Sequence, residues 1–144
     1  MLVHHILISK DDFGVLSLKP DAKVSEAVTM LSEKRIGTIV ISKDGKHPDG
    51  ILSERDIVRE LGKRGAACLD EPVSTMMTAR PVTCTESDSA DAILTTMTNG
   101  RFRHIPVVKD GVMIGLVSIG DVVKARLSEL SMERDALTGM ISGH

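Results

Sequence analysis

Aromatic side chains are nearly absent from this sequence, which has no Trp, no Tyr and only two Phe residues, Phe13 and Phe102. A hydrophobic core must therefore be built from Ile, Val, Leu, Met and Ala. Platforms that stack bases and cages that bind quaternary ammonium groups both need aromatic rings, so both are nearly excluded. A flat ligand would have to be held by aliphatic side chains and by main-chain groups.

Three other features are missing. The net charge of 18 − 20 = −2 gives no basic surface for general nucleic-acid binding. The two cysteines, Cys68 and Cys84, lack the close spacing of a metal knuckle or a redox pair. No apolar run approaches the roughly 18 residues of a membrane helix, and the first ten residues lack the features of a signal peptide. We therefore expect a cytoplasmic protein with reduced thiols and no nucleic-acid or membrane partner.

The chain repeats itself. Arg101 follows Arg35 by 66 positions, and Asp121 follows Asp56 by 65, because the loop of the first copy holds one more residue. A duplicated unit tolerates such a change in a turn. We predict an N-terminal segment at 1–14, a first repeat at 15–62, a linker at 63–81, a second repeat at 82–127 and a C-terminal helical tail at 128–144.

Each copy predicts the element order β-α-β-β-α. A short extended stretch and a helix with apolar residues at helical spacing precede two β-branched strands joined by an Asp-Gly turn, and a second helix follows. The predicted strand pairs are 38–41 with 50–53 and 105–108 with 114–118. One unit has too little core to stand alone. We therefore expect an α+β fold, an α/β sandwich of two pseudo-symmetric repeats packed sheet to sheet around a common aliphatic centre.

Both second helices begin with the pattern Ser-x-x-Asp, at Ser53 and Asp56 and again at Ser118 and Asp121. Such a pair can simply cap a helix, and for a single occurrence capping is the favoured interpretation. The same geometry can bind a nucleotide, because a helix N-terminus attracts phosphate and a carboxylate accepts hydrogen bonds from a ribose diol. Two occurrences, each after a Gly-led strand in a tandem repeat, favour the ligand site.

These motifs resemble those of the cystathionine-β-synthase (CBS) domain. The resemblance rests on Gly-hydrophobic-x-Ser-x-x-Asp in both copies and on Ile-Pro-Val-Val-x-Asp-Gly in the second. Residues 51–59 and 100–107 are similar to stand-alone bacterial CBS-pair proteins. Two copies in tandem resemble a Bateman module, which implies regulatory binding of AMP, ATP, NAD(H) or S-adenosylmethionine between the repeats. It also implies association into homodimers that act on an effector protein, here unknown.

The resemblance assigns roles residue by residue. Asp56 and Asp121 would take ribose hydroxyls, with Ser53 and Ser118 beside the ribose or phosphate, and Ile51 and Leu116 would line the adenine. Sites in the family combine both repeats. The Asp121 site would therefore borrow Ile36, Gly37 and Thr38, and the Asp56 site would borrow Phe102, Arg103 and His104.

Charge differs between the copies at the expected phosphate positions. Arg55 lies in the helix start of the first copy, where the second has Gly120, and Arg103 and His104 replace Gly37 and Thr38. Arg offers a planar fork that suits phosphate oxygens, and His104 would add charge only when protonated. The alternative is that these are exposed charges on a wet surface. We expect two unequal sites, for two mononucleotides or one dinucleotide.

No catalytic constellation is evident: the sequence has no nucleophile-base pair, no Gly-Lys-Ser/Thr loop and no metal-ligand spacing, so we expect neither an enzyme nor a catalytic cofactor. Two hypotheses remain, a nucleotide sensor that acts through a homodimer and a ligand-free interaction scaffold.

Two features lie outside the repeats. His4 and His5, taken as strand residues, are interpreted as surface residues. An apolar stripe on the last helix needs a cover, which we expect a second chain to supply. The stripe consists of Val123, Leu127, Leu130, Leu137 and Ile141.

Overall fold

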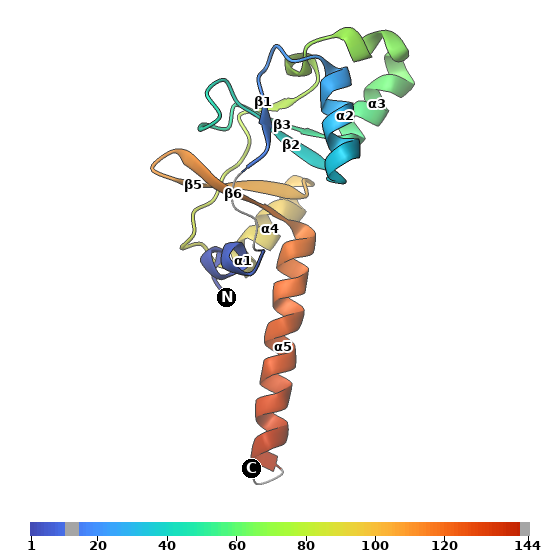
Figure 1. Ribbon diagram of the computed structural model, residues 1–144. Helices are drawn as coiled ribbons and strands as arrows, with labels where there is room; N and C mark the ends of the chain where they lie inside the picture. The colour runs from blue at the N-terminus through green and yellow to red at the C-terminus, as the bar shows by residue number, and fades with distance from the viewer. Residues whose placement is uncertain (11–14, 142–144) are drawn as a thin grey trace.

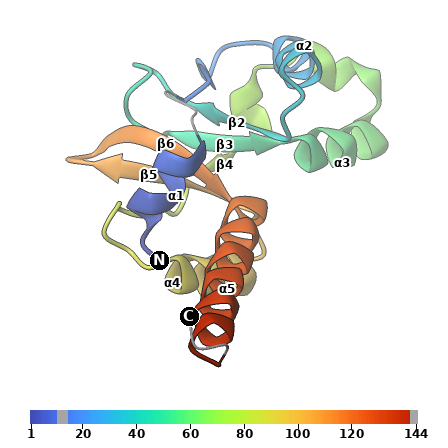
Figure 2. The ribbon, with the colours of Figure 1, turned by 60° about the horizontal axis from the view of Figure 1, so that its bottom comes forward.

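The computed structural model describes residues 1–10 and 15–141. Phe13 and the last three residues of the predicted helical tail lie outside the described residues. Helices α2 and α3 cover one side of a pair of stacked sheets, and α1, α4 and the base of α5 cover the other (Figures 1 and 2). The α+β fold of two packed repeats with a long last helix is confirmed.

The first repeat forms a four-stranded sheet with the order β1-β2-β3-β4. β2 pairs in parallel with β1 and antiparallel with β3, and β3 also pairs antiparallel with β4. The strands predicted at 38–41 and 50–53 are confirmed. Its elements are β1 (Ser17–Leu18), α2 (Val24–Lys34), β2 (Thr38–Ile41), β3 (Gly50–Ser53) and α3 (Glu54–Arg64), followed by 3-10 turns at Ala66–Asp70 and Val73–Thr75 and by β4 (Thr78–Ala79).

The second repeat forms a two-stranded antiparallel sheet with a bulge between Val107 and Val108. The extended stretch predicted at its start forms only one bridge, from Cys84 to Val107, because its neighbours are exposed. The expected long C-terminal helix is α5, which starts directly after β6 and includes residues 128–141 of the predicted tail. The elements are α4 (Ala90–Gly100), β5 (His104–Lys109), β6 (Val112–Ser118) and α5 (Ile119–Ile141).

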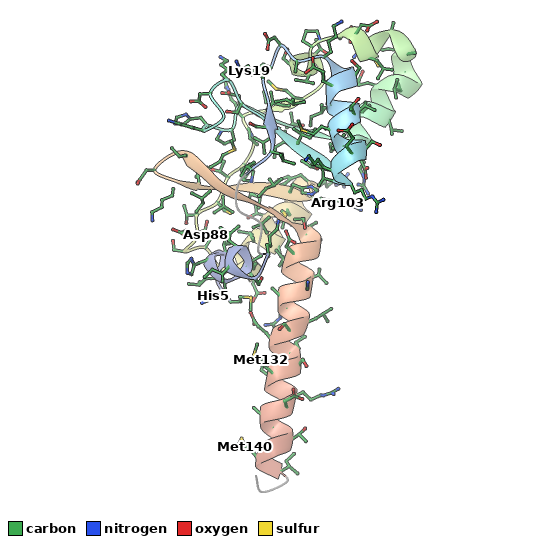
Figure 3. The ribbon with its side chains drawn as sticks, viewed as in Figure 1. His5, Lys19, Asp88, Arg103, Met132 and Met140 are labelled. Atoms are coloured by element: carbon green, nitrogen blue, oxygen red, sulfur yellow. The ribbon has the colours of Figure 1, made fainter. Side chains whose placement is uncertain are left out.

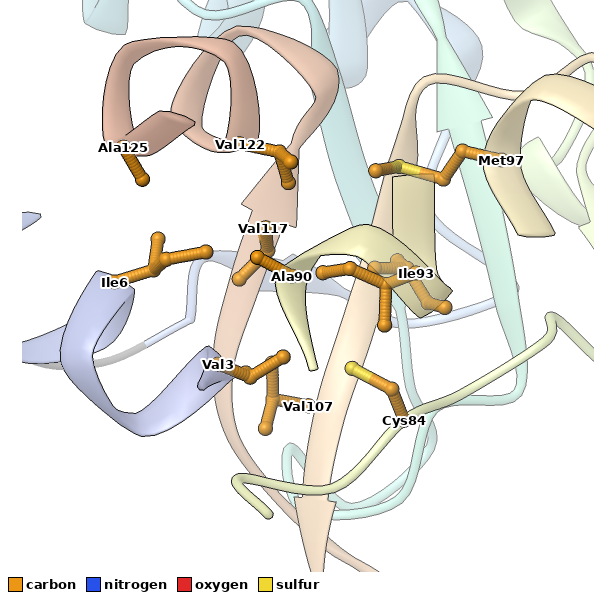
Figure 4. Close-up of a cluster of buried hydrophobic side chains, with 11 residues drawn as sticks. Val3, Ile6, Cys84, Ala90, Ile93, Met97, Val107, Val117, Val122 and Ala125 are labelled. Atoms are coloured by element: carbon orange, nitrogen blue, oxygen red, sulfur yellow. The ribbon is translucent and has the colours of Figure 1, made fainter. Parts of the chain in front are cut away.

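The buried apolar side chains form two clusters, one for each repeat, instead of the single aliphatic centre expected. The cluster of the second repeat draws on α1, α4, β5, β6 and α5 (Figure 4). The strand β2 shows why there are two. Ile39 and Ile41 face the first cluster, and alternation along the strand turns Thr38 and Val40 toward the other repeat. The sheets therefore meet through a thin layer between two cores.

The N-terminal segment is helical, so the interpretation of His4 and His5 as strand residues is wrong, although both are exposed as expected. α1 (Val3–Lys10) buries Val3 and Ile6 completely in the second cluster. Gly115 on β6 lets it approach, because a Cβ there would lie 2.5 Å from Leu7 Cδ2. The helix is thus part of the core of the second repeat.

The far half of α5 projects from the body of the molecule and carries Met132 and Met140, which are both exposed (Figures 1 and 3). Only Val122 and Ala125 of this helix are buried. All members of the predicted apolar stripe are exposed, and Leu127 and Leu137 are about 60% exposed.

Truncating a side chain inside the second cluster should cost more than the same truncation on α5. Met97 on α4 is completely buried in the second cluster. We therefore expect Met97→Ala to lower the free energy of unfolding by about 2–5 kcal/mol, since it leaves a cavity. The exposed Met132→Ala serves as the matched control and should change it by less than about 0.5 kcal/mol. Urea denaturation measures both, and equal costs would contradict the described core.

Candidate nucleotide site between the repeats

Two clefts lie between the repeats. The larger, the Asp56 cleft, has a volume of about 520 Å³, and the smaller, the Asp121 cleft, about 280 Å³. Ligand pockets span roughly 300–1,000 Å³, so the first has ample room and the second is marginal. Both share Gly37, Thr38 and His104 as a common wall. The Asp56 cleft is lined in addition by Ile51, Ser53, Glu54, Arg55, Asp56, Arg59, Thr78, Arg80, Pro81, Val82, Gly100, Arg101, Phe102 and Arg103. The Asp121 cleft is lined in addition by Leu7, Lys10, Val15, Leu16, Ile36, Gly115, Leu116, Ser118 and Asp121.

Each serine-aspartate pair forms a capping box at a strand-to-helix junction. Ser53 Oγ accepts a hydrogen bond from Asp56 N at 3.2 Å, and Asp56 Oδ2 accepts one from Ser53 N at 3.0 Å. The pair Ser118 and Asp121 repeats this arrangement at 3.0 and 2.9 Å. The capping interpretation is therefore correct for both pairs. It uses only Oδ2 of each aspartate and leaves Oδ1 for other partners.

The two junctions are fixed in the same way within their own repeats. The first helical amide of α3, Glu54 N, donates to Gly37 O, and that of α5, Ile119 N, donates to Arg103 O, both at 2.9 Å. The residue before β2 is thus tied to the start of α3, and the residue before β5 is tied to the start of α5. This bond sets the distance between the aspartate and the common wall.

The Asp56 cleft is rich in arginine. Its rim carries Arg55, Arg59, Arg80, Arg101 and Arg103, all exposed, against two acidic residues, Glu54 and Asp56. The rim therefore has a formal charge of 5 − 2 = +3. Arg59 donates to Asp56 Oδ1 at 2.8 Å across one helical turn. Guanidinium groups gathered at an open rim are suited to several phosphate oxygens at once.

The Asp121 cleft contains a different cation, Lys10, from the end of α1. Its ammonium donates to Asp121 Oδ2 at 2.8 Å and to the main-chain carbonyl of Leu116 at 2.6 Å. Burial by itself would raise the pKa of Asp121. The hydrogen bonds from Lys10 and Ser118 outweigh it, and the pKa lies below its ordinary value.

His104 stands on the common wall, where its Nδ1 lies 2.9 Å from Thr38 Oγ1. Burial lowers its pKa, with Lys10 and Arg103 acting in the same direction against Asp121 and Glu54. The imidazole is therefore neutral at neutral pH. It holds the two repeats together there and adds no charge to a phosphate site.

Known proteins resemble this chain over most of its length. The model of the CBS domain matches residues 8–63 and 73–128. The chain belongs to the CBS domain family. A mitochondrial CBS domain-containing protein of Arabidopsis thaliana is 36% identical over 127 residues, which are 85% of this chain and 62% of the relative. The chain thus spans less than two thirds of that relative.

Solved CBS structures have the same fold. The structure of a CBS-domain containing protein from Agrobacterium tumefaciens is 39% identical, covers 88% of this chain and 99% of its own, and superposes with a TM-score of 0.83. A CBS domain protein of Pyrobaculum aerophilum, solved in complex with AMP, is 29% identical, covers 92% of this chain and 99% of its own, and has a TM-score of 0.77.

All the site residues predicted from the sequence line one of the clefts between the CBS repeats. The seven predicted around Asp56 line the Asp56 cleft, and the six predicted around Asp121 line the Asp121 cleft. Each cleft draws on both repeats, as the resemblance implied. Among the described residues, no group of three or more His, Cys, Asp or Glu side chains is placed to hold a metal ion. Nor is any helix in residues 1–10 and 15–141 long and apolar enough to cross a membrane.

Sequence reasoning missed several lining residues of the CBS clefts. Arg59 follows Asp56 by one helical turn, and this spacing was a usable signal. Arg80 and Lys10 lie in the segments that precede the second and first repeats, outside the motifs. No signal in the sequence pointed to these two residues.

Replacing Lys10 with Met should raise the pKa of Asp121, because burial would then act without the opposing ammonium. NMR titration of the Asp121 carboxyl measures the change. The control is Lys124→Met, which removes an exposed lysine of α5 and should leave the pKa of Asp121 unchanged.

The same contact predicts how stability depends on pH. The folded-state pKa of Asp121 lies below the unfolded value of about 3.9, so its contribution to stability is present above that pH. It disappears as the pH falls through the lowered pKa, and the difference in unfolding free energy between wild type and Lys10→Met should shrink over that range. An unchanged Asp121 pKa in Lys10→Met would contradict the described contact.

Proposed function

We propose that this chain is a regulatory module that binds an adenine nucleotide of the AMP, ATP or NAD(H) type and acts through a homodimer on a partner protein. One observation carries the proposal. The Ser53-Asp56 helix start opens into a cleft whose opposite wall comes from the other repeat and whose rim carries five arginines. A ligand there would touch both repeats, so its binding would depend on how they are arranged.

The lining of the Asp56 cleft suits the three parts of a nucleotide. Aliphatic side chains from the two sides, Ile51 and Val82, offer contact for adenine in a chain without Trp or Tyr. Asp56 Oδ1 faces an exposed arginine, which a ribose diol can displace at little cost, because exposed ion pairs contribute about 0–1 kcal/mol. The remaining arginines provide donors for one or more phosphates.

The AMP complex of the Pyrobaculum relative, 29% identical to this chain, supports an adenosine-containing ligand. A regulatory role without catalysis agrees with the CBS domain family to which the chain belongs. A cytoplasmic location remains a prediction of the cysteine content and of the N-terminal sequence.

A ligand-free scaffold is the second candidate, because both serine-aspartate pairs already serve as helix caps. Under this alternative the clefts are gaps between two repeats that need each other for stability. The alternative gives no reason for five arginines to gather beside Asp56. The two candidate functions can therefore be distinguished by measuring whether the Asp56 cleft binds a nucleotide.

Asp56→Asn should weaken nucleotide binding while preserving the cap, since the amide oxygen can still accept from Ser53 N. Losing one charged hydrogen-bond acceptor costs about 1.5–3 kcal/mol, so we expect a loss of affinity of at least about tenfold. Calorimetry with AMP, ATP, NADH and S-adenosylmethionine measures the affinity. Asp91→Asn, which changes an exposed aspartate in the first turn of α4, is the matched control. If no ligand binds wild type below the millimolar range, the scaffold hypothesis replaces the sensor.

The exposed stripe on α5 supports the proposed homodimer. We expect wild type to sediment as a dimer and the variant Leu127→Glu/Leu137→Glu as a monomer, because two charges would enter the apolar contact. Met132→Glu changes an equally exposed residue off the stripe and should remain dimeric. Analytical ultracentrifugation decides the matter. A monomeric wild type would overturn the homodimer, and a dimeric double variant would assign it to another surface.

A further inference from the structure

We propose that Lys10 occupies the Asp121 cleft from within, so that the resting chain binds nucleotide only in the Asp56 cleft. The Asp121 cleft would then accept a nucleotide only when the Lys10 side chain leaves it. Lys10 is thus a residue that decides how many ligands the module binds. The inference rests on the proposed function and adds to it a means of regulating the second site.

Lys10 contacts two groups beside which a nucleoside would bind, although on Asp121 it engages Oδ2, the oxygen that the cap also uses, and not Oδ1. Its ammonium bridges Asp121 Oδ2 at 2.8 Å and Leu116 O at 2.6 Å. The carboxylate is the acceptor for a ribose diol, and a main-chain carbonyl in the cleft is the acceptor for the exocyclic amine of adenine. A side chain that joins these two acceptors lies across the space between them, in a cleft of only about 280 Å³.

The backbone that carries Lys10 is anchored firmly. α1 buries Val3 and Ile6 in the core of the second repeat, and Leu7 packs against Gly115. Val3 N and His4 N donate to main-chain oxygens of Asp88 and Glu86. Removal of the ammonium therefore needs only a rotation of the lysine side chain, which has four rotatable bonds, while α1 stays in place.

The Asp56 cleft has no equivalent internal occupant. Arg80 precedes the second repeat as Lys10 precedes the first, but among the described residues it forms no ion pair with Asp56. The cation that does pair with Asp56 is Arg59, which belongs to the same helix and has a side chain 54% exposed. The Lys10 side chain is 26% exposed and binds a second acceptor. A ligand therefore displaces a surface contact in one cleft and an inserted cation in the other.

The test is the number of AMP molecules bound per chain, measured by calorimetry on the full chain. Wild type should bind one AMP per chain. This binding should be lost in Asp56→Asn and retained in Asp121→Asn. Lys10→Met should bind a second AMP, with an affinity at least about tenfold above any residual second binding by wild type, and Lys10→Met/Asp121→Asn should lose this second binding event. Lys124→Met removes an exposed lysine of α5 and should behave as wild type. Lys10→Ala repeats the test with a side chain that cannot fill the cleft, and urea denaturation verifies that each variant is folded.

Three results overturn this proposal alone, each in a different way, and a fourth overturns the proposed function together with it. If wild type binds two AMP molecules and Asp121→Asn removes one, Lys10 does not close the cleft. If Lys10→Met and Lys10→Ala weaken that second binding event, Lys10 is a ligand contact and not an occupant. If both variants still bind one AMP, the Asp121 cleft is closed for another reason. If neither wild type nor any variant binds AMP, the proposed function itself is wrong, and the ion pair between Lys10 and Asp121 is only structural.

Discussion

The hydrogen bond between Thr38 and His104 joins the two repeats at the wall that the two clefts share. The two residues occupy the same position in the two copies, at the start of β2 and β5, and their side-chain atoms lie 2.9 Å apart. Both line both clefts. A change in the separation of the sheets at this point therefore alters the common wall of the two sites together. Because burial keeps His104 neutral, the contact carries no net charge that a nearby phosphate would disturb.

The two clefts differ more in charge than the two copies of the repeat do, because each cleft combines residues from both copies. Arg55 stands where the second copy has Gly120, and Arg103 stands where the first has Gly37. These are substitutions in opposite copies. Since each cleft combines the helix start of one repeat with the strand loop of the other, both arginines fall in the Asp56 cleft. A composite site thus converts two single changes into one strongly basic cleft and one nearly neutral one.

The features predictable from the sequence are those encoded by short-range pattern and by the repeat. The β-branched run at 38–41, the Asp-Gly turns and the Ser-x-x-Asp pairs predict the strands and the helix starts, and the tandem resemblance predicts the composite clefts. The helix α1 was not predictable in this way, because the four apolar residues among its eight show no clear helical face. It becomes a helix by filling the core of the second repeat.

The ion pair of Lys10 was inaccessible to sequence reasoning for the same reason. It joins residues 111 positions apart, and nothing near Lys10 in the sequence marks it as a partner of Asp121. The two separate cores also depend on tertiary packing. Composition predicts that the interior is aliphatic, but not that Thr38, Val40 and their counterparts form a thin layer between two clusters.

Capping and ligand binding are compatible roles for the same serine and aspartate. The cap engages Oδ2 of Asp56 with Ser53 N and Oγ, and this fixes the rotamer of the carboxylate. A ligand that accepts this orientation does not have to order the side chain, so less of its binding energy is lost to conformational entropy. The remaining oxygen, Oδ1, accepts from Arg59, one of the arginines of the rim. In a chain without aromatic platforms, this preorganisation by main-chain and capping contacts is the means by which a small nucleotide can be held specifically.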